Sequence, residues 1–264
     1  MQKIHVIYRI SDKGYNKDKS KLDNATKKHC LMNAAEIFGR ENFYVIADNC
    51  SQELVSFIRD EGFMFEETHG GNGPTFKRAL TKAVSEYDDD DIAYLLEDDY
   101  LHLPGSLELI REGLAIADYV TLYDHPDQYE KYTLRRKGAA PLNRWNFLKT
   151  RVYLTEHSHW REIPSTTMTF AARVKTLKED CRILMCQPDT GPTDDFGTFL
   201  KLTKRRSLID AVNILQMPKR LAALIVMNNF ALFRKKRKLI VCIPGRATHC
   251  ETKWLSPLVD WTKI

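Results

Sequence analysis

The chain has 264 residues, of which 43% are hydrophobic and 28% are charged, and its formal net charge is +5 at pH 7. This length and apolar content suffice for the core of one large domain or two small ones, and they exclude a disordered or fibrous protein. The longest apolar stretch, residues 221–233, is shorter than the roughly 20 residues of a membrane-spanning helix. No secretory signal is visible, and the six scattered cysteines form no CxxC pair, so we expect a cytoplasmic protein with reduced thiols.

Strand and helix patterns alternate through the first part of the chain. Apolar runs predict strands at residues 3–10, 43–47 and 92–96, and a short strand is expected at residues 63–67. Helical spacing of apolar residues predicts helices at residues 24–38, 51–58 and 75–87. Gly39 closes the first helix, and Ser51 or Asn49 caps the second. This alternation is typical of parallel strands with covering helices, which bind ligands at the carboxyl ends of the strands.

The remaining part of the chain is less regular. Strands are expected at residues 119–122, 166–171 and 239–243, and helices at residues 196–202 and, with a break at Pro218, at residues 207–233. The sequence contains no internal repeat and no clear linker. We therefore predict one α/β domain with a C-terminal helical addition.

The strongest local signal is an apolar strand that ends in three consecutive carboxylates, Glu97, Asp98 and Asp99. Unpaired carboxylates are costly to bury, so these three must meet solvent, cations or a metal. Alternation along a strand predicts that Glu97 and Asp99 share one side while Asp98 faces away. Carboxylate oxygens suit Mg²⁺ or Mn²⁺, which hold diphosphate oxygens in turn; an acidic loop after the strand is the alternative.

Two further segments carry residues of interest. The pair Asp194 and Asp195 precedes a predicted helix, where it either caps the helix or acts as a general base toward a bound hydroxyl. His249 follows an apolar strand and a Pro-Gly turn, and it is either a metal ligand or a structural histidine. The chain contains neither a P-loop nor GxGxxG after the first strand, and HExxH and GxSxG are also absent from the sequence.

The basic charge is concentrated in one segment. Residues 201–240 hold eleven basic residues and one acid, a charge of +10, so the rest of the chain carries −5. Such a segment suits an anionic partner such as nucleic acid or an acidic membrane surface, or it is a solvated helix face. The residues predicted to bind the anion are Arg234, Lys235, Lys236, Arg237 and Lys238. A peripheral place at the membrane would fit the same segment.

Taken in order, these segments resemble GT-A glycosyltransferases of the family-2-like group, in particular small stand-alone bacterial and viral enzymes. The resemblance rests on the Glu-Asp-Asp motif, on the Asp194–Asp195 pair, and on residues 117–129, 159–180, 243–251 and 254–261. It implies a Rossmann-like mixed sheet flanked by helices, in a single domain over residues 1–264. Residues 1–104 would bind the nucleotide sugar and residues 105–264 the acceptor, with a basic helical insertion at about residues 205–238.

The resemblance also implies roles for single residues. The donor would meet Tyr8, Arg9, Asp48, Asn72, Glu97 and Asp98. Mn²⁺ or Mg²⁺ would be held by Asp99, Glu97 and His249. Asp195, in preference to Asp194, would be the general base. The acceptor side would be lined by Asp124, His125, His159, Trp160 and Thr167.

We therefore expect a metal-dependent enzyme that moves a sugar from a UDP- or GDP-linked donor to an acceptor hydroxyl, with inversion. The expected acceptor is a glycan or a lipid-linked saccharide. One alternative is a phage-type DNA glycosyltransferase acting on hydroxymethylated bases, for which the basic segment would track phosphates. Another is a non-catalytic module that binds a nucleotide sugar or nucleic acid. No protein partner can be inferred from the sequence.

Overall fold

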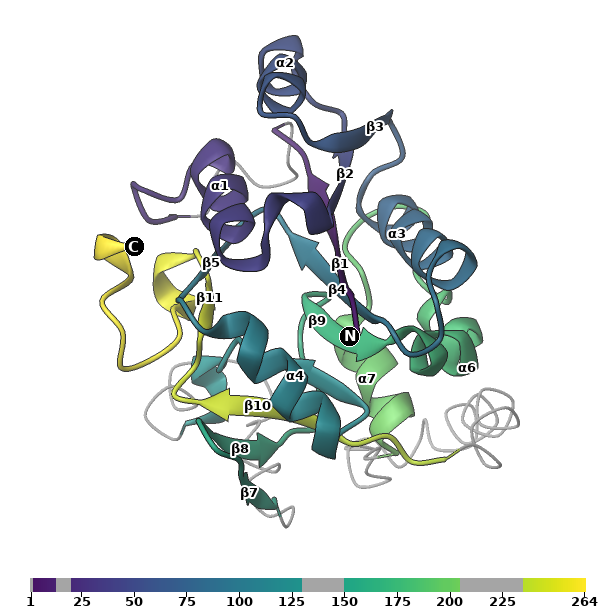
Figure 1. Ribbon diagram of the computed structural model, residues 1–264, viewed down its shortest axis with the longest axis vertical. Coiled ribbons are helices and arrows are strands. Elements are labelled where there is room, and N and C mark those ends of the chain that lie inside the picture. Colours follow the sequence, from purple (N-terminus) through teal and green to yellow (C-terminus); the bar gives the residue numbers. More distant parts are fainter. Residues whose placement is uncertain (1, 13–19, 130–149, 205–234) are drawn as a thin grey trace, which may run out of the picture.

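The computed structural model describes residues 2–12, 20–129, 150–204 and 235–264 (Figure 1). Four parallel strands come from the first part of the chain: β1 (Ile4–Ile10), β2 (Phe43–Asp48), β3 (Met64–Thr68) and β4 (Ile92–Glu97). The helices between them are α1 (Lys27–Phe38), α2 (Gln52–Asp60) and α3 (Asn72–Glu86). The carboxyl ends of these strands therefore meet at one edge of the sheet.

Later strands extend this sheet. They are β6 (Tyr119–Thr121), β7 (Val152–Leu154), β8 (His159–Glu162), β9 (Phe170–Arg173) and β10 (Leu239–Ile243). Within the described residues the order is β3-β2-β1-β4-β9-β6-β10-β8-β7, with β9 and β8 antiparallel to their neighbours. A separate antiparallel pair joins β5 (Tyr100–His102) to β11 (Ala247–His249). The remaining helices of eight or more described residues are α4 (Ser106–Ile116), α6 (Val174–Leu184) and α7 (Asp195–Thr203).

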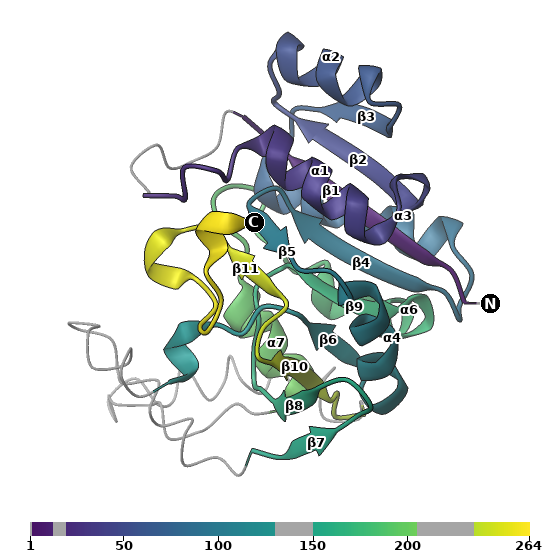
Figure 2. The same ribbon diagram turned by 60° about the vertical axis from the view of Figure 1, so that its left-hand side comes forward.

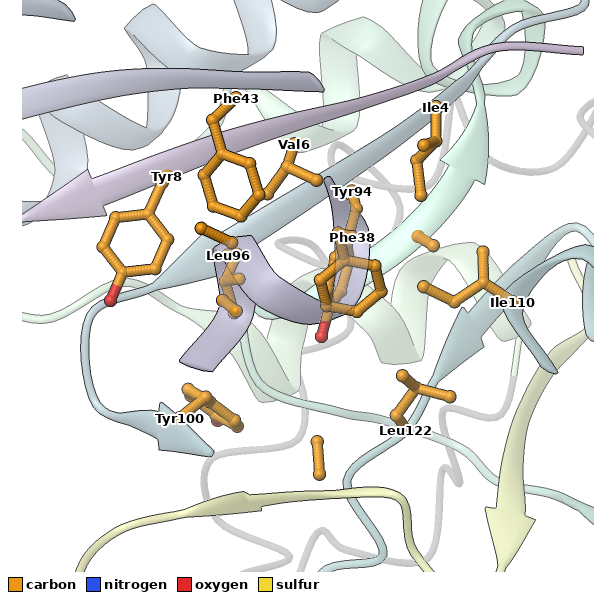
Figure 3. Packing of buried hydrophobic residues seen from close by; sticks show 14 of the residues in the cluster. Ile4, Val6, Tyr8, Phe38, Phe43, Tyr94, Leu96, Tyr100, Ile110 and Leu122 are labelled. Carbon is orange, nitrogen blue, oxygen red and sulfur yellow. The ribbon is translucent and has the colours of Figure 1, made fainter. Parts of the chain in front are cut away.

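Two helical layers cover the main sheet (Figure 2). Alternate residues of β1 point to opposite faces, so Val6 and Tyr8 pack with α1 and α4 while Ile7 packs with α3, α6 and α7. Figure 3 shows the first of these cores, in which the Tyr8 ring packs against Phe43 and the Phe38 ring against Tyr94. Burial on both faces explains why β1, β2 and β4 are largely apolar in the sequence, whereas the edge strand β3 has no fully buried residue.

Local signals account for several helix boundaries. The Thr26 hydroxyl accepts the His29 amide at 3.1 Å and caps α1, and Gly39 ends that helix with a positive φ of 82°. Ser51 rather than Asn49 caps α2. The third helix begins at Asn72, ahead of the predicted residue 75. Glycine is required at position 73, since a Cβ there would lie 1.8 Å from the carbonyl oxygen of Pro188.

The mixed α/β architecture predicted from the sequence is confirmed, with local differences. The strand expected at residues 166–171 lies further along, as β9, and β5, β7, β8 and β11 were not predicted. The helix expected at residues 207–233, with its break at Pro218, lies outside the described residues, as does nearly all of the predicted insertion. Among the described residues, no helix combines the length and apolar character needed to span a bilayer.

Candidate active site

A polar cluster lies on the α3 side of the sheet edge. Arg9 and Glu97 are register partners on β1 and β4, and Arg9 Nη2 lies 2.9 Å from Glu97 Oε1. The same guanidinium donates through Nη1 to Asn72 Oδ1 at 2.7 Å, at the start of α3. From β9's side, the Thr169 hydroxyl accepts the Glu97 amide at 3.2 Å and lies 3.3 Å from Glu97 Oε2. These contacts hold the Glu97 carboxylate in one orientation.

Asp195 belongs to this cluster. It is the first residue of α7, and its Oδ1 atom is buried with no hydrogen-bond partner. Burial, and then the negative charge of Glu97, raise the pKa of Asp195 to about 7, although Thr193 and Arg9 oppose the shift. A carboxyl with this pKa exchanges a proton near neutral pH, which is the property of a general base.

The neighbouring Asp194 has a different role. Its Oδ1 accepts the Gly197 amide at 3.0 Å, and it is the N-cap of α7. The sequence left open whether this acidic pair caps a helix or acts on a substrate. In the structure, the cap is Asp194, and the side chain whose pKa responds to the charges of Glu97 and Arg9 is Asp195.

The prediction that Glu97 and Asp99 share one side is wrong. Strand β4 ends at Glu97, and the chain turns at Asp98 and Asp99 before β5, so the alternation of a strand no longer applies. Asp98 accepts the Ser11 amide at 2.6 Å and lies 2.5 Å from Lys27 Nζ. Both aspartates therefore pair with residues near α1 and β11, away from the Arg9–Glu97 pair.

Asp99 forms a second ionic cluster. Its Oδ2 lies 3.0 Å from Lys21 Nζ and 3.2 Å from His249 Nε2, and β11 pairing places His249 opposite Tyr100. Burial disfavours the charged imidazole, but the Asp99 carboxylate outweighs it and raises the pKa of His249. Burial likewise opposes ionisation of Asp99, but His249, Lys21 and Lys27 hold its pKa well below the ordinary value.

The three residues predicted to bind Mn²⁺ or Mg²⁺ do not converge on one point. Asp99 and His249 are adjacent, but Glu97 is paired with Arg9 at the other cluster. Across the described ranges, no three His, Cys, Asp or Glu side chains are grouped closely enough to hold a metal ion. The arrangement of these side chains therefore does not fit a metal site with the predicted ligand set.

Two residues predicted to bind the donor already have partners within the folded chain. Asp48 accepts hydrogen bonds from the Thr68 hydroxyl, the Gly70 and Gly71 amides and the Asn49 side chain, at 2.7–3.0 Å. The Tyr8 ring is fully buried in the core, because even-numbered residues of β1 face α1. A ligand therefore cannot contact the Tyr8 ring, whereas the Arg9 side chain points to the polar cluster that contains Glu97. The nucleoside contact of Asp48 stays a prediction.

The predicted acceptor residues lie in several environments. Asp124 is buried, accepts the Tyr129 hydroxyl and lies 3.3 Å from Arg161 Nη2. Burial is the main cause of its raised pKa. A chain of ring contacts links this region to Asp99, because the Tyr123 ring lies 5.1 Å from His125 and 6.4 Å from His249.

The other three predicted acceptor residues differ in accessibility. Thr167 accepts the Tyr100 hydroxyl at 2.8 Å, and His159 is exposed at the start of β8. Trp160 is fully buried, and its indole donates to the Thr155 hydroxyl at 2.8 Å. The placement of Trp160 on the acceptor side is therefore wrong, since strand alternation turns its ring inward beneath α4.

The basic segment also requires a correction. Arg237 is 5% exposed, and its guanidinium reaches Asp180 at 2.7 Å, Glu179 at 2.6 Å and Asp118 at 3.3 Å. Lys235 pairs with Asp118, Lys236 lies 3.8 Å from Glu162, and Lys238 donates to the Ile116 carbonyl. Arg234 lies outside the described residues. The predicted anion-binding role is wrong for Arg237, because acids of the same chain already surround it.

Sequence reasoning missed four residues that complete these clusters. Lys21, Lys27, Thr169 and Arg161 carry no motif of their own, and only their contacts with Asp99, Asp98, Glu97 and Asp124 single them out. Thr169 lies within the TTMTFA segment, which was one part of the resemblance. Arg161 lies in the same segment of the resemblance, residues 159–180. A single sequence contains no signal for Lys21 and Lys27.

No protein-family model matches the sequence, and no curated protein is similar to it in sequence. Similar solved structures include S. aureus TarS 1-349, at 16% identity over 76% of this chain and 54% of that chain, with a TM-score of 0.43. Glucosyl-3-phosphoglycerate synthase from Mycobacterium tuberculosis, in complex with Mn²⁺, UDP-glucose and phosphoglyceric acid, is 11% identical over 77% of this chain and 66% of that chain, with a TM-score of 0.43.

A third similar structure is CMP:2-keto-3-deoxy-manno-octonic acid synthetase complexed with CTP, at 11% identity over 92% of both chains and a TM-score of 0.44. The structures similar to this chain thus include nucleotide-sugar transferases. This chain spans little more than half of the TarS chain. At such identities the likeness is one of fold, and activity must be inferred from the side chains of the site.

Proposed function

We propose that the protein is a glycosyltransferase that moves a sugar from a nucleotide-sugar donor to an acceptor hydroxyl, with inversion at the anomeric carbon. The observation that carries the proposal is the state of Asp195. This carboxyl has a buried oxygen without a hydrogen-bond partner, is affected by the charges of Glu97 and Arg9, and has a pKa of about 7. An unsatisfied buried carboxylate is costly to the fold, which supports a functional reason for it.

The chemistry follows from that carboxylate. A sugar hydroxyl is a poor nucleophile until its proton is removed, and Asp195 is suited to remove it. Attack on the anomeric carbon breaks its bond to the diphosphate, and the diphosphate leaves with the electron pair. Direct displacement without a covalent intermediate inverts the configuration at that carbon.

Nucleotidyl transfer to a sugar phosphate is the second candidate. A phosphate oxygen is already anionic at neutral pH, so that reaction needs no general base, and the buried Asp195 favours glycosyl transfer. DNA as the acceptor receives no support from the described part of the basic segment, where Lys235, Lys236 and Arg237 pair with acids. A glycan or lipid-linked saccharide remains the proposed acceptor.

A donor screen tests the proposal. The full chain is incubated with UDP- and GDP-linked sugars, with Mn²⁺, with Mg²⁺ and with a chelator, and release of nucleoside diphosphate is measured. We expect turnover of at least one donor, and a loss of about 10²–10⁴-fold in Asp195→Asn. Asp194→Asn should retain activity, since asparagine is an equally good N-cap.

Release of diphosphate from a nucleoside triphosphate, in place of nucleotide-sugar turnover, would assign the protein to nucleotidyl transfer. Full activity in Asp195→Asn would remove the proposed base. If Asp194→Asn were inactive and Asp195→Asn active, Asp194 would be the general base instead of Asp195.

A further inference from the structure

Two lysines stand at the turn that follows β4. Lys27 Nζ lies 2.5 Å from Asp98 Oδ1, and Lys21 Nζ lies 3.0 Å from Asp99 Oδ2. Their side chains remain 28% and 30% exposed, so both lysines are paired with a carboxylate while part of each side chain reaches solvent. An ammonium has three N–H groups, and the described structure shows one of them used at each lysine. Each can therefore donate to an anion that arrives at this edge.

Backbone contacts fix the positions of these two lysines. Residues 20–22 run antiparallel to residues 250–252, through the Leu22 amide to the Cys250 carbonyl and the Thr252 amide to the Ser20 carbonyl, each at 3.0 Å. The C-terminal segment lies beside β5 and α1 in Figure 2. Lys27 is the first residue of α1, and Thr26 fixes that helix start. Both lysines are thus held next to the carboxylates by the fold.

The charges of the site balance without an external cation. Glu97, Asp98 and Asp99 each have a protein cation as partner, namely Arg9, Lys27 and Lys21. The residues predicted to hold a metal do not converge, as described above. The ammonium groups of Lys21 and Lys27, at the end of a central strand, are nevertheless suited to bind a diphosphate. Charge-assisted contacts to phosphate oxygens are among the strong hydrogen bonds of proteins.

We propose that Lys21 and Lys27 bind the diphosphate of the donor and stabilise it as it leaves, in the role that the sequence suggested for a metal ion. This inference rests on the proposed glycosyl transfer. In that step the bond from the anomeric carbon to the diphosphate oxygen breaks, and its electron pair stays on that oxygen beside the two ammonium groups. The acceptor oxygen bonds to the carbon, and its proton passes to Asp195.

The test measures binding of UDP, GDP and inorganic diphosphate to the full chain by titration calorimetry in the presence of a chelator. Wild type should bind at least one nucleotide and inorganic diphosphate without added metal. Lys21→Met and Lys27→Met should each weaken binding by about ten- to a hundredfold, the range for hydrogen bonds to charged groups. Lys28→Met is the matched control, because Lys28 is adjacent to Lys27 but pairs with Glu53 and should bind as wild type does.

A double variant separates contact from simple charge balance. Asp98→Asn combined with Lys27→Met removes one charge of each sign, and the asparagine oxygen can still accept the Ser11 amide. If Lys27 contacts the diphosphate, binding stays weak in the double variant. Recovery to the wild-type affinity would show that Lys27 only neutralises Asp98, and it would overturn the inference. Thermal unfolding of each variant verifies that it is folded.

The same binding measurements with added metal complete the test. If wild type binds the nucleotides only after Mn²⁺ or Mg²⁺ is added, and the lysine variants then bind equally well, the inference is wrong while glycosyl transfer stands. If the donor screen finds no nucleotide-sugar turnover under any condition, the proposed function itself fails. If wild type turns over a nucleotide sugar in the presence of chelator, and turnover falls in both lysine variants, the result supports both the proposed function and the role of the two lysines.

Discussion

Replacing Asp195 with asparagine should stabilise the folded protein above neutral pH while it slows transfer. The carboxyl has a pKa of about 7 in the folded chain against an ordinary value of 3.8. Between these values the folded chain holds a proton on Asp195 that the unfolded chain has lost. Stability contributed by this group is therefore present at low pH and is lost as the pH rises through the folded pKa.

The size of the effect follows from the two pKa values. One pKa unit corresponds to about 1.4 kcal/mol, so ionising this buried carboxyl costs the folded state up to about 4 kcal/mol at a pH above the folded pKa. Asparagine is an uncharged isostere and does not incur this cost. Since 1 kcal/mol shifts the midpoint by about 2–4 °C in a protein near this size, Asp195→Asn should melt about 10 °C higher above neutral pH.

The assay is thermal unfolding of wild type and variant across a pH series, with turnover measured in parallel. The advantage of Asp195→Asn should vanish near about pH 4 and grow until about pH 7, then level off. Wild-type kcat/KM should rise with pH along a limb of apparent pKa about 7, because the base must be ionised. Asp194→Asn should show neither effect, since it retains the N-cap.

A variant that is less stable than wild type at high pH would refute the reasoning. So would a stability difference that does not change between about pH 4 and about pH 7, because linkage requires it to follow the titration. Either result would mean that Asp195 is already stabilised as a carboxylate, and its role as a base would lose its physical support.

Three further predictions concern the surrounding structure. Arg237→Met should lower the free energy of unfolding by about 3–5 kcal/mol, since it removes a buried cation from three carboxylates, whereas Lys236→Met, in the same segment but exposed, should change the melting temperature little. Gly73→Ala should destabilise by about 1–3 kcal/mol or more in denaturant unfolding, because the added Cβ meets the Pro188 carbonyl, and an unchanged midpoint would contradict this close approach. Thr169→Val should slow turnover about tenfold by releasing the Glu97 carboxylate, and the serine variant should restore it, as measured by steady-state kinetics.

The order of strands and helices in the first part of the chain could be predicted because its signals are local. Apolar runs form β1, β2 and β4, and Gly39 and Ser51 lie directly beside the helices whose boundaries they mark. The position of Glu97, Asp98 and Asp99 at the end of β4 was predictable for the same reason. Parallel strands then bring that end to the edge where the Asp195 helix begins.

The sides on which the three carboxylates lie could not be predicted from the sequence. Alternation holds only while the chain is a strand, and it stops at Glu97, where the turn into β5 sends Asp98 and Asp99 toward α1. Likewise, a pattern of two aspartates does not reveal which one caps α7 and which one faces Glu97. That choice depends on where the helix is packed.

Charge composition indicated a basic segment but not its partners. The guanidinium of Arg237 is buried among acids that lie far from it in the sequence, such as Asp118 and Asp180, so its charge is used inside the fold. Lys21 and Lys27 have no motif, and they reach the carboxylates only because residues 250–252 hold the segment before α1 in place. Local patterns determined the elements of the first part of the chain and the strand-end carboxylates, whereas contacts between distant segments decided which cation meets which acid, because such pairings exist only once the chain is packed.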